Sequence, residues 1–274
     1  MSNSSLASYV ALNSKNVSNR GNNKIFYVIP HCYVGQVTAK QGVDAFNKRS
    51  GASVHYIVGK DGSIGQQVDE KYRAWTTGGD KTLVNSYGTF TGRAMDFQGV
   101  TIECACDSFA PYAITEEAYA ALVNLMADIA KRDLGGELRW KNDSNLVGRP
   151  EEQNVLVHRW FARKACPGDY IMEHLTDICE KANTVIKTGV PYVAQEIVMT
   201  AAKPTLKHGS KGAQVKLLQQ NLQHLGYSVG SCGADGDFGN ATKLAVIAFQ
   251  NGYGLTKDGI YGPKSYAAMI AALK

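Results

Sequence analysis

Short apolar runs rich in β-branched and aromatic residues alternate with segments of helical periodicity over the first part of the chain. The runs at 25–29 and 100–106 predict buried strands, and those at 53–58 and 63–68 predict a hairpin around the turn at 59–62. Helical spacing of apolar residues is found at 39–49 after Thr38, in the stretch after Thr115, and at about 170–186. Because strands and helices interleave, we predict an α/β fold with a mixed central sheet flanked by helices.

The hydrophobic pattern loosens between 188 and 204, where Gly and Pro residues interrupt it. We therefore predict a first domain over 1–187, a linker over 188–204 and a second domain over 205–274. A helix is expected at about 212–226, near the start of the second domain.

The second domain contains an internal repeat, Asp-Gly-x-aromatic-Gly-x-x-hydroxyl. Its two copies, at 235–242 and 258–265, start 23 residues apart. Each copy predicts a tight turn that delivers an aromatic anchor, followed by a hydroxyl residue that caps a helix. With the helix at about 212–226, the repeat predicts a compact three-helix domain. A calcium loop is disfavoured, because Gly239 stands where an oxygen ligand is needed and no Glu closes the loop.

Composition sets broad limits on the protein. With 274 residues and 44% apolar content, the chain can bury a substantial core. It has no run of eighteen apolar residues, so no membrane span is expected. Six cysteines in a chain of this length do not form a disulfide scaffold, which fits synthesis in a reducing compartment. The first residues lack a charged region followed by an apolar one, so we expect no Sec-type signal peptide and synthesis in the cytoplasm.

The small net charge of +5 is unevenly distributed along the chain. Residues 205–274 contain seven Lys and three Asp, a net charge of +4, while the rest of the chain carries +1. The positive net charge of 205–274 favours an anionic partner such as a cell-wall polymer, a phospholipid or a nucleic acid. Nucleic acid is the least favoured of the three, because 205–274 contains no Arg and its Lys residues are scattered.

The segment 158–168 carries the strongest chemical signal. His158 and Cys166 stand eight residues apart, with Lys164 between them and a Pro-Gly turn at the end. This spacing does not suit one face of a helix, so the segment is interpreted as a loop folded around a bound group. His and Cys are preferred zinc ligands, and a catalytic zinc takes three protein ligands and one water. His31, where the first predicted strand ends, is the best candidate for the third ligand.

Two further residues suit hydrolysis at such a centre. Zinc lowers the pKa of its bound water to about 7, and a hydrolase also needs a base and an oxyanion donor. Glu103 is a carboxylate within an apolar strand, where an unpaired charge is costly and often functional. Lys164 stands two residues before Cys166 and is expected to face the metal region, where it can stabilise an oxyanion.

Simpler interpretations of these residue types remain open from the residues alone. A histidine at a strand end such as His31 is more often an ordinary polar residue, and Cys166 on its own is more often a buried thiol. His55 is expected to pack or hydrogen-bond within the hairpin. Cys104 and Cys106 face the same side of a strand, where core filling is favoured over a metal pair. Trp75 fits a core position and a sugar-stacking wall equally well.

Several motifs occur together in the order found in one enzyme family. They are Ile25–His31, Val54–Val58 before Gly-Lys-Asp-Gly-Ser, Ala74-Trp75, Val100–Glu103 and His158–Gly168. Residues 6–180 thereby resemble the zinc N-acetylmuramoyl-L-alanine amidases of type 2, relatives of the peptidoglycan recognition proteins, and the pattern His-x5-Lys-x-Cys-Pro is highly specific. Residues 205–274 resemble the peptidoglycan-binding type 1 domain. Bacterial peptidoglycan is therefore the expected polymeric partner.

The resemblance implies roles for individual residues. His31, His158 and Cys166 would bind Zn²⁺, Glu103 would be the general base, and Lys164 would stabilise the oxyanion. The bond cleaved would be the amide between the lactyl group of N-acetylmuramic acid and L-alanine of the stem peptide.

The chain departs from the family pattern at two positions. Val54 stands where some members have a catalytic tyrosine, so Glu103 would act as the base alone. Thr76 stands after Trp75 where many members have a histidine, and the pair Trp75 and Thr76 is assigned to the substrate wall.

The amino-acid sequences of segments 68–75 and 158–162 are similar to those of endolysins of Gram-positive, clostridia-like hosts. The resemblance therefore implies a phage or prophage endolysin, made in the host cytoplasm and acting on the cell wall after release. The alternatives are a bacterial autolysin of the same chemistry and a non-catalytic peptidoglycan-recognition protein. Recognition proteins of this fold typically lack the metal thiolate, whereas this chain has Cys166.

Overall fold

The computed structural model describes residues 3–13, 15–79, 81–193 and 205–272. The chain divides into two compact units, Met1–Ala194 and Gln195–Lys274, which are described separately. Each has a hydrophobic core of its own.

The first unit is built on a five-stranded mixed sheet with the strand order β1-β5-β4-β9-β3. Strands β3, β9 and β4 run parallel to one another, and β5 is antiparallel to β4 as the predicted hairpin requires. The bounds of these strands are Tyr9–Val10 (β1), Tyr27–Cys32 (β3), Tyr56–Val58 (β4), Ile64–Gln66 (β5) and Gly99–Cys104 (β9). The predicted α/β fold with a mixed sheet is confirmed.

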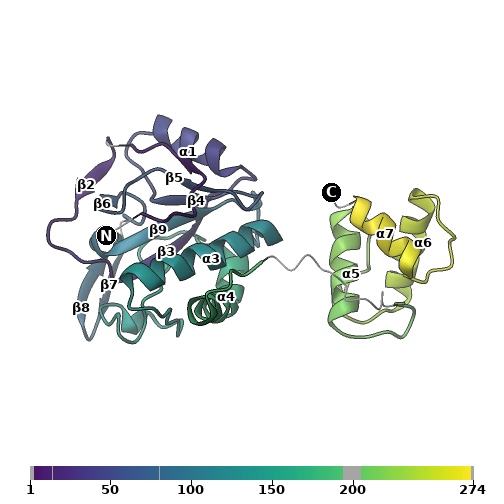
Figure 1. The fold of residues 1–274 in the computed structure, drawn as a ribbon. Coiled ribbons are helices and arrows are strands. Elements are labelled where there is room, and N and C mark those ends of the chain that lie inside the picture. Colours follow the sequence, from purple (N-terminus) through teal and green to yellow (C-terminus); the bar gives the residue numbers. More distant parts are fainter. Residues whose placement is uncertain (1–2, 14, 80, 194–204, 273–274) are drawn as a thin grey trace. The chain divides into compact units, whose positions relative to one another are not determined.

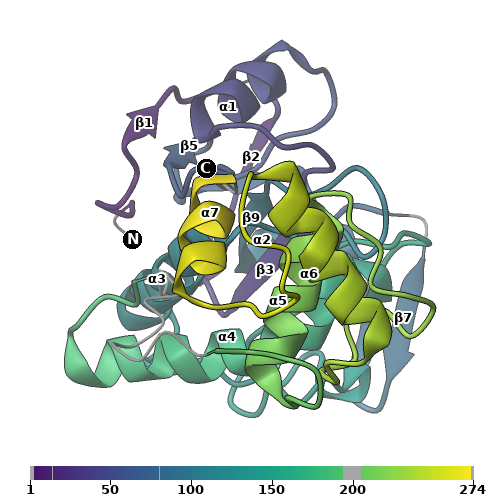
Figure 2. The same cartoon turned by 90° about the vertical axis from the view of Figure 1, so that its right-hand side faces the viewer.

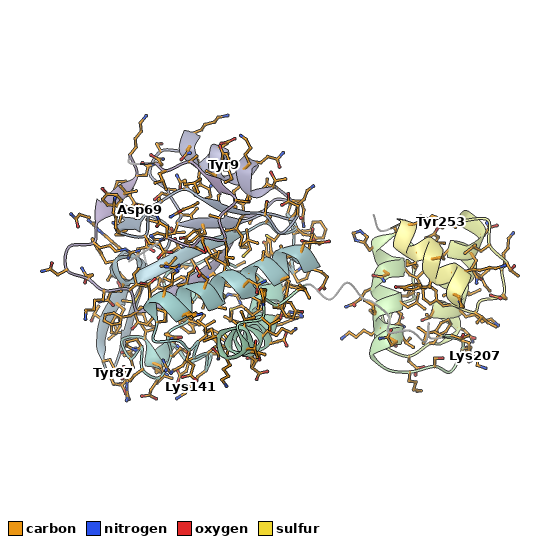
Figure 3. All side chains as sticks on the ribbon, in the orientation of Figure 1. Tyr9, Asp69, Tyr87, Lys141, Lys207 and Tyr253 are labelled. Atoms are coloured by element: carbon orange, nitrogen blue, oxygen red, sulfur yellow. The ribbon has the colours of Figure 1, made fainter. Side chains whose placement is uncertain are left out.

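Helices cover both faces of this sheet (Figures 1 and 2). Helices α3 (Glu116–Asp133) and α4 (Asp169–Thr188) pack against each other and against one face, where they enclose the main core. Helix α1 (Ala39–Lys48) packs on the other side of β4 and β5 through a smaller cluster that includes Phe46 and Ile57. In Figure 3, the labelled Tyr9 lies beside α1, where its hydroxyl donates to Asp44 at 2.7 Å.

The predicted helix starts follow from capping. The side chain of Thr38 accepts from the backbone N–H of Gln41, whose own side chain accepts from the backbone N–H of Thr38 and so completes a capping box. The side chain of Thr115 caps α3 by accepting from Ala118 N–H, and two acidic residues follow it in the first turn. Both predicted N-caps are confirmed.

Two pairs of short strands and one short helix lie beside the main sheet and position part of the site. Strands β2 (Val17–Asn19) and β6 (Tyr72–Ala74) form one antiparallel pair, and β7 (Thr82–Asn85) and β8 (Gly88–Thr91) form another. Helix α2 (Gly92–Gln98) follows directly and leads into β9.

The described part of the second unit contains three helices, α5 (Ala213–His224), α6 (Asn240–Gly252) and α7 (Pro263–Ala272), as predicted. The aromatic residues of the repeat, Phe238 and Tyr261, are both buried anchors of its core. The predicted hydroxyl cap is wrong for the first copy, because Gly239 occupies the N-cap position of α6 and Thr242 lies inside the helix. Ser265 likewise lies inside α7.

Each hydroxyl of the repeat instead contacts a buried glutamine. The amide nitrogen of Gln219 lies 2.9 Å from Thr242 Oγ1 and also reaches Asp235 and the carbonyl of Asp237, while its oxygen accepts from Gly236 N–H. Gln250 makes the same four contacts in the second copy; its partners are Asp258, Gly259, Ile260 and Ser265. The two turns are therefore held from inside by equivalent side chains.

The domain boundary predicted at 187 stays a prediction. Helix α4 ends at Thr188, and Tyr192 still contacts α3, because Asn124 exchanges two hydrogen bonds with its backbone. Residues 194–204 of the predicted linker lie outside the described residues. Among the helices that are described, none has both the length and the apolar character needed to cross a bilayer.

Candidate metal centre

Strand register brings His31 and His158 together. Residues 154–157 run alongside β3, where Val28 and Val155 form a parallel bridge with backbone bonds on both sides. Each histidine follows its bridge residue by three positions, so a parallel register places the two side by side. Their rings meet edge to face with centroids 4.9 Å apart.

The loop after His158 returns Cys166 to the same place. A short 3₁₀ turn begins at His158, and Arg159 N–H donates to the carbonyl of Cys166 at 3.1 Å, which closes the loop at its base. Cys166 Sγ lies 3.2 Å from Nδ1 of His31. The eight-residue spacing is thus a loop folded back on itself, as the sequence predicts.

The three side chains form a group that fits a metal ion. Ligand atoms of His31, His158 and Cys166 all lie within 4.8 Å of one another, and all three residues are buried. Nε2 of His158 is buried without a hydrogen-bond partner, which is costly for an imidazole that is only structural. Two imidazoles and one thiol are a donor set that zinc prefers, and three protein ligands are typical of a catalytic site.

The electrostatics of the centre keep both imidazoles neutral. Burial holds the pKa of His31 well below its usual range, and the nearby His158 and Lys164 add to the effect. Burial, with a further contribution from Lys164, lowers the pKa of His158 to about 4. Neutral imidazole is the form that binds metals, so both rings are prepared for coordination at neutral pH.

Glu103 lies beside this group because β9 is the neighbour of β3. His31 and Glu103 are directly paired in the parallel register, so both side chains project on the same face of the sheet. The strand ends at Cys104 and not at 106, where the predicted run ends, so Glu103 lies near its carboxyl end. Its Oε2 is buried without a hydrogen-bond partner. Burial raises the pKa of Glu103 to about 8, against the opposing influence of Arg49 and Lys164.

A cavity of about 330 Å³ connects these residues. Its wall includes the predicted residues Glu103, Lys164, Trp75 and Thr76 together with two of the three metal-site side chains, His158 and Cys166. Lys164 is exposed at the rim. A second cavity of about 460 Å³ shares Trp75, Thr76 and Lys164 with the first, so the wall continues beyond the metal centre.

Trp75 and Thr76 are held in place by hydrogen bonds to neighbouring segments. The indole N–H of Trp75 donates to Ser18 Oγ at 2.8 Å, and the hydroxyl of Thr76 donates to the carbonyl of Ser53 at 2.6 Å. Both residues are half-buried and form part of the cavity wall, so Trp75 is a wall residue rather than a core residue.

The remaining histidine and cysteines of interest lie outside the centre. His55 is fully buried and hydrogen-bonds Arg20, Thr101 and the carbonyl of Tyr72, in agreement with the predicted packing role. Cys104 and Cys106 are both buried in or against the main core, as favoured above.

Three residues around the metal centre have no counterpart in the sequence-based predictions. Arg49, at the end of α1, lines the cavity and lies over the ring of Phe46 at 4.6 Å. Tyr112 also lines the cavity and has a positive φ of 62°. Thr77 lies behind the metal group, with its hydroxyl 3.2 Å from Nε2 of His31. No motif marks these three residues, because chain segments distant in sequence bring them to the site.

Comparison with known proteins agrees with this arrangement. The family model for N-acetylmuramoyl-L-alanine amidase matches residues 21–169, more than half of the chain, and that for a peptidoglycan binding domain matches 211–269. The amidase match includes every residue of the metal group and its cavity wall.

Two curated relatives come from Bacillus licheniformis. The chain is 27% identical over 229 residues to the N-acetylmuramoyl-L-alanine amidase CwlL, covering 82% of this chain and 58% of that protein. It is 45% identical over 123 residues to a second protein named as an N-acetylmuramoyl-L-alanine amidase, covering 43% of this chain and 35% of the relative. The chain thus spans only about half or less of the length of these relatives.

A solved mutant endolysin from Bacillus subtilis is 17% identical, with 65% of this chain and 97% of that one covered at a TM-score of 0.42. The extent of the family match, taken with the His-His-Cys group on the edge of the sheet, decides the assignment. This chain belongs to the N-acetylmuramoyl-L-alanine amidase family.

Proposed function

We propose that the protein is a zinc-dependent N-acetylmuramoyl-L-alanine amidase. It hydrolyses the amide bond between the lactyl carboxyl of N-acetylmuramic acid and the amino group of L-alanine in the stem peptide. The observation that carries the proposal is the group of His31, His158 and Cys166 beside a cavity that is also lined by a buried carboxylate and a lysine, in a chain of this family.

The donor set suits zinc, which when held by the three residues would supply Lewis acidity and make water nucleophilic at neutral pH. Glu103 accepts a proton from the attacking water, a role that its burial favours because a carboxylate removed from bulk water is a stronger base, with a raised pKa. The same carboxyl group then passes the proton to the departing amine of L-alanine. The products are a free lactyl carboxylate and a new amino terminus.

Lys164 acts on the charge that develops on the carbonyl oxygen during attack. Its ammonium group stands at the rim of the cavity, close enough to lower the pKa of both histidines. Among the described residues, none forms an ion pair with it, so its ammonium group is free to donate to the substrate. Trp75 and Thr76 form the adjacent wall against which the glycan or peptide packs.

The test is digestion of purified cell wall and soluble muropeptide. Mass spectrometry should detect stem peptides with a free L-alanine amino terminus and glycan with a free lactyl carboxylate. A chelator should abolish the activity, and added zinc should restore it. Absence of turnover from protein shown by elemental analysis to be fully zinc-loaded would exclude the enzyme and favour a recognition protein.

The second unit serves, in the same proposal, to hold the enzyme on intact wall. Its match to a peptidoglycan binding domain family and its net charge of +4 support this role. A protein ending at residue 193 should hydrolyse soluble muropeptide at the rate of the full chain but sediment poorly with insoluble wall. Equal sedimentation of both proteins would contradict the anchoring role.

At the finer level we propose a phage endolysin that accumulates in the host cytoplasm and reaches the wall at release. The similarity of 68–75 and 158–162 to endolysins of Gram-positive hosts supports this choice over an autolysin. Expression in a clostridial host should cause lysis only after the membrane is permeabilised. Lysis or wall turnover with an intact membrane would favour the autolysin instead.

A further inference from the structure

His31 contacts a different group with each of its ring nitrogens. Nδ1 lies 3.2 Å from the Sγ of Cys166, and Nε2 lies 3.2 Å from the hydroxyl oxygen of Thr77. A neutral imidazole carries a hydrogen on only one nitrogen, and the other nitrogen has the lone pair that can bind a metal. The identity of the nitrogen that carries hydrogen therefore decides whether His31 presents a ligand toward Cys166.

Thr77 is in turn held by the buried carboxylate of Asp96. The backbone N–H of Thr77 donates to both carboxylate oxygens at 3.0 Å, and its hydroxyl also bonds this carboxylate. Asp96 is completely buried and accepts a further bond from Thr76 N–H at 3.1 Å. An ionised carboxylate only accepts hydrogen bonds, so the hydroxyl of Thr77 must donate to Asp96. Its oxygen is then left to accept from Nε2–H of His31.

Helix α2 fixes this chain of contacts in space. Asp96 belongs to α2, and Thr91 caps the start of the helix through Ala94 N–H. The first helical residue is Gly92, where a Cβ would lie only 1.8 Å from the carbonyl oxygen of Thr77. The helix can therefore press directly against the backbone of Thr77, and the carboxylate has one fixed direction toward it.

We propose that Thr77, anchored by Asp96, is a positioning residue of the metal centre that holds His31 with its hydrogen on Nε2 and its Nδ1 directed at the metal. This inference rests on the metal-binding part of the proposed function, not on the identity of the substrate. The outer hydrogen bond of a ligating histidine fixes the orientation of the ring and increases its basicity, and its loss typically weakens metal binding by about 10- to 100-fold.

The first test is zinc affinity, measured by competition with a chromogenic chelator. Thr77→Val removes the hydroxyl at nearly constant shape and should raise the Kd for zinc by about 10- to 100-fold. Thr77→Ser keeps the hydroxyl and should restore most of the affinity. Thr101→Val is the matched control, because Thr101 is also buried and bonds a buried histidine, His55, at 2.9 Å. Unchanged zinc affinity in folded Thr77→Val protein would overturn the proposal.

The second test needs no variant and stays decisive if Thr77→Val does not fold. Long-range ¹⁵N–¹H correlation spectra of the metal-free wild-type protein report which nitrogen of His31 carries hydrogen. We expect the Nε2–H form at neutral pH, and an Nδ1–H form would overturn the proposal. Because this readout requires no turnover, it separates the inference from the proposed function: a protein that does not cleave wall can still show the Nε2–H form.

Discussion

The cavity beside the metal centre in the first unit and the repeat turns in the second unit both bury polar side chains. In the turns these side chains are hydrogen-bonded, whereas at the cavity some of their polar atoms have no partner. In the turns, Gln219 and Gln250 each use both their nitrogen and their oxygen, and each has four partners at 2.8–3.1 Å. At the cavity, Glu103 Oε2 and His158 Nε2 are buried without any partner.

The pKa values of the carboxylates in the two regions are shifted in opposite directions. Bonds from Asp237 N–H and Gln219 hold the pKa of Asp235 below its usual range, whereas burial raises that of Glu103 to about 8. A buried polar group without a partner costs free energy, so it persists only where something other than stability requires it. The buried polar groups of the repeat turns thus stabilise the turn conformation, whereas those of the cavity remain free to bind a metal or a substrate.

Of the changes considered, replacing Glu103 should reduce amidase activity the most. Glu103→Gln keeps the size of the side chain but removes the base, so kcat on soluble muropeptide should fall by about 10²- to 10⁴-fold. Zinc content should not change, because the carboxylate is not among the three grouped ligands. Activity within a few fold of wild type would assign the base to another residue.

Removing the ammonium group of Lys164 should have the next largest effect. One oxyanion donor is typically worth about 10²- to 10³-fold in kcat, so Lys164→Met should lose activity in that range while retaining zinc. Arg163→Met is the matched control, since this neighbouring cation is exposed but does not line either cavity wall. Equal losses in the two variants would show a general effect of charge rather than a donor at the cavity.

The smallest expected effect concerns the repeat turns of the second unit and tests whether Gln219 stabilises them. Gln219→Leu leaves Gly236 N–H and the turn oxygens without their inner partner, and it should destabilise the second unit by about 1–3 kcal/mol in denaturant unfolding. Gln220→Leu, on the exposed side of the same helix, should change stability little. Hydrolysis of soluble muropeptide should be normal in both, because the first unit has a separate core. No loss of stability in Gln219→Leu would remove the distinction between the two regions.

Local signals in the sequence predict much of the fold. The capped helices after Thr38 and Thr115 and the hairpin around 59–62 are found where periodicity and turn residues predict them. These elements depend on residues within a few positions of one another, so their causes are visible in the chain itself. The hydroxyls of the repeat are the exception: Thr242 was predicted to cap a helix, but its partner Gln219 lies 23 residues away.

For the site as well, some features can be predicted from the sequence and others depend on the tertiary structure. The spacing of His158, Lys164 and Cys166 within one loop, and the carboxylate of Glu103 in an apolar strand, are properties of the sequence. Only tertiary structure decided that β3 pairs with β9, so that Glu103 lies beside His31. It also decided the roles of Gln219 and Gln250, which precede their Asp residues by different distances, 16 and 8 positions, and so carry no repeat signal.

By itself, the sequence determined the kinds of chemical group available, the local elements that carry them, and the division into a first part with the metal-site residues and a second part with the repeat. The tertiary structure decided which groups are buried, which of them find partners, and that Asp96 and Thr77 stand behind His31. The physical reason is that hydrogen bonding and burial depend on segments brought together from distant positions, whereas capping, turns and periodicity act within a few residues.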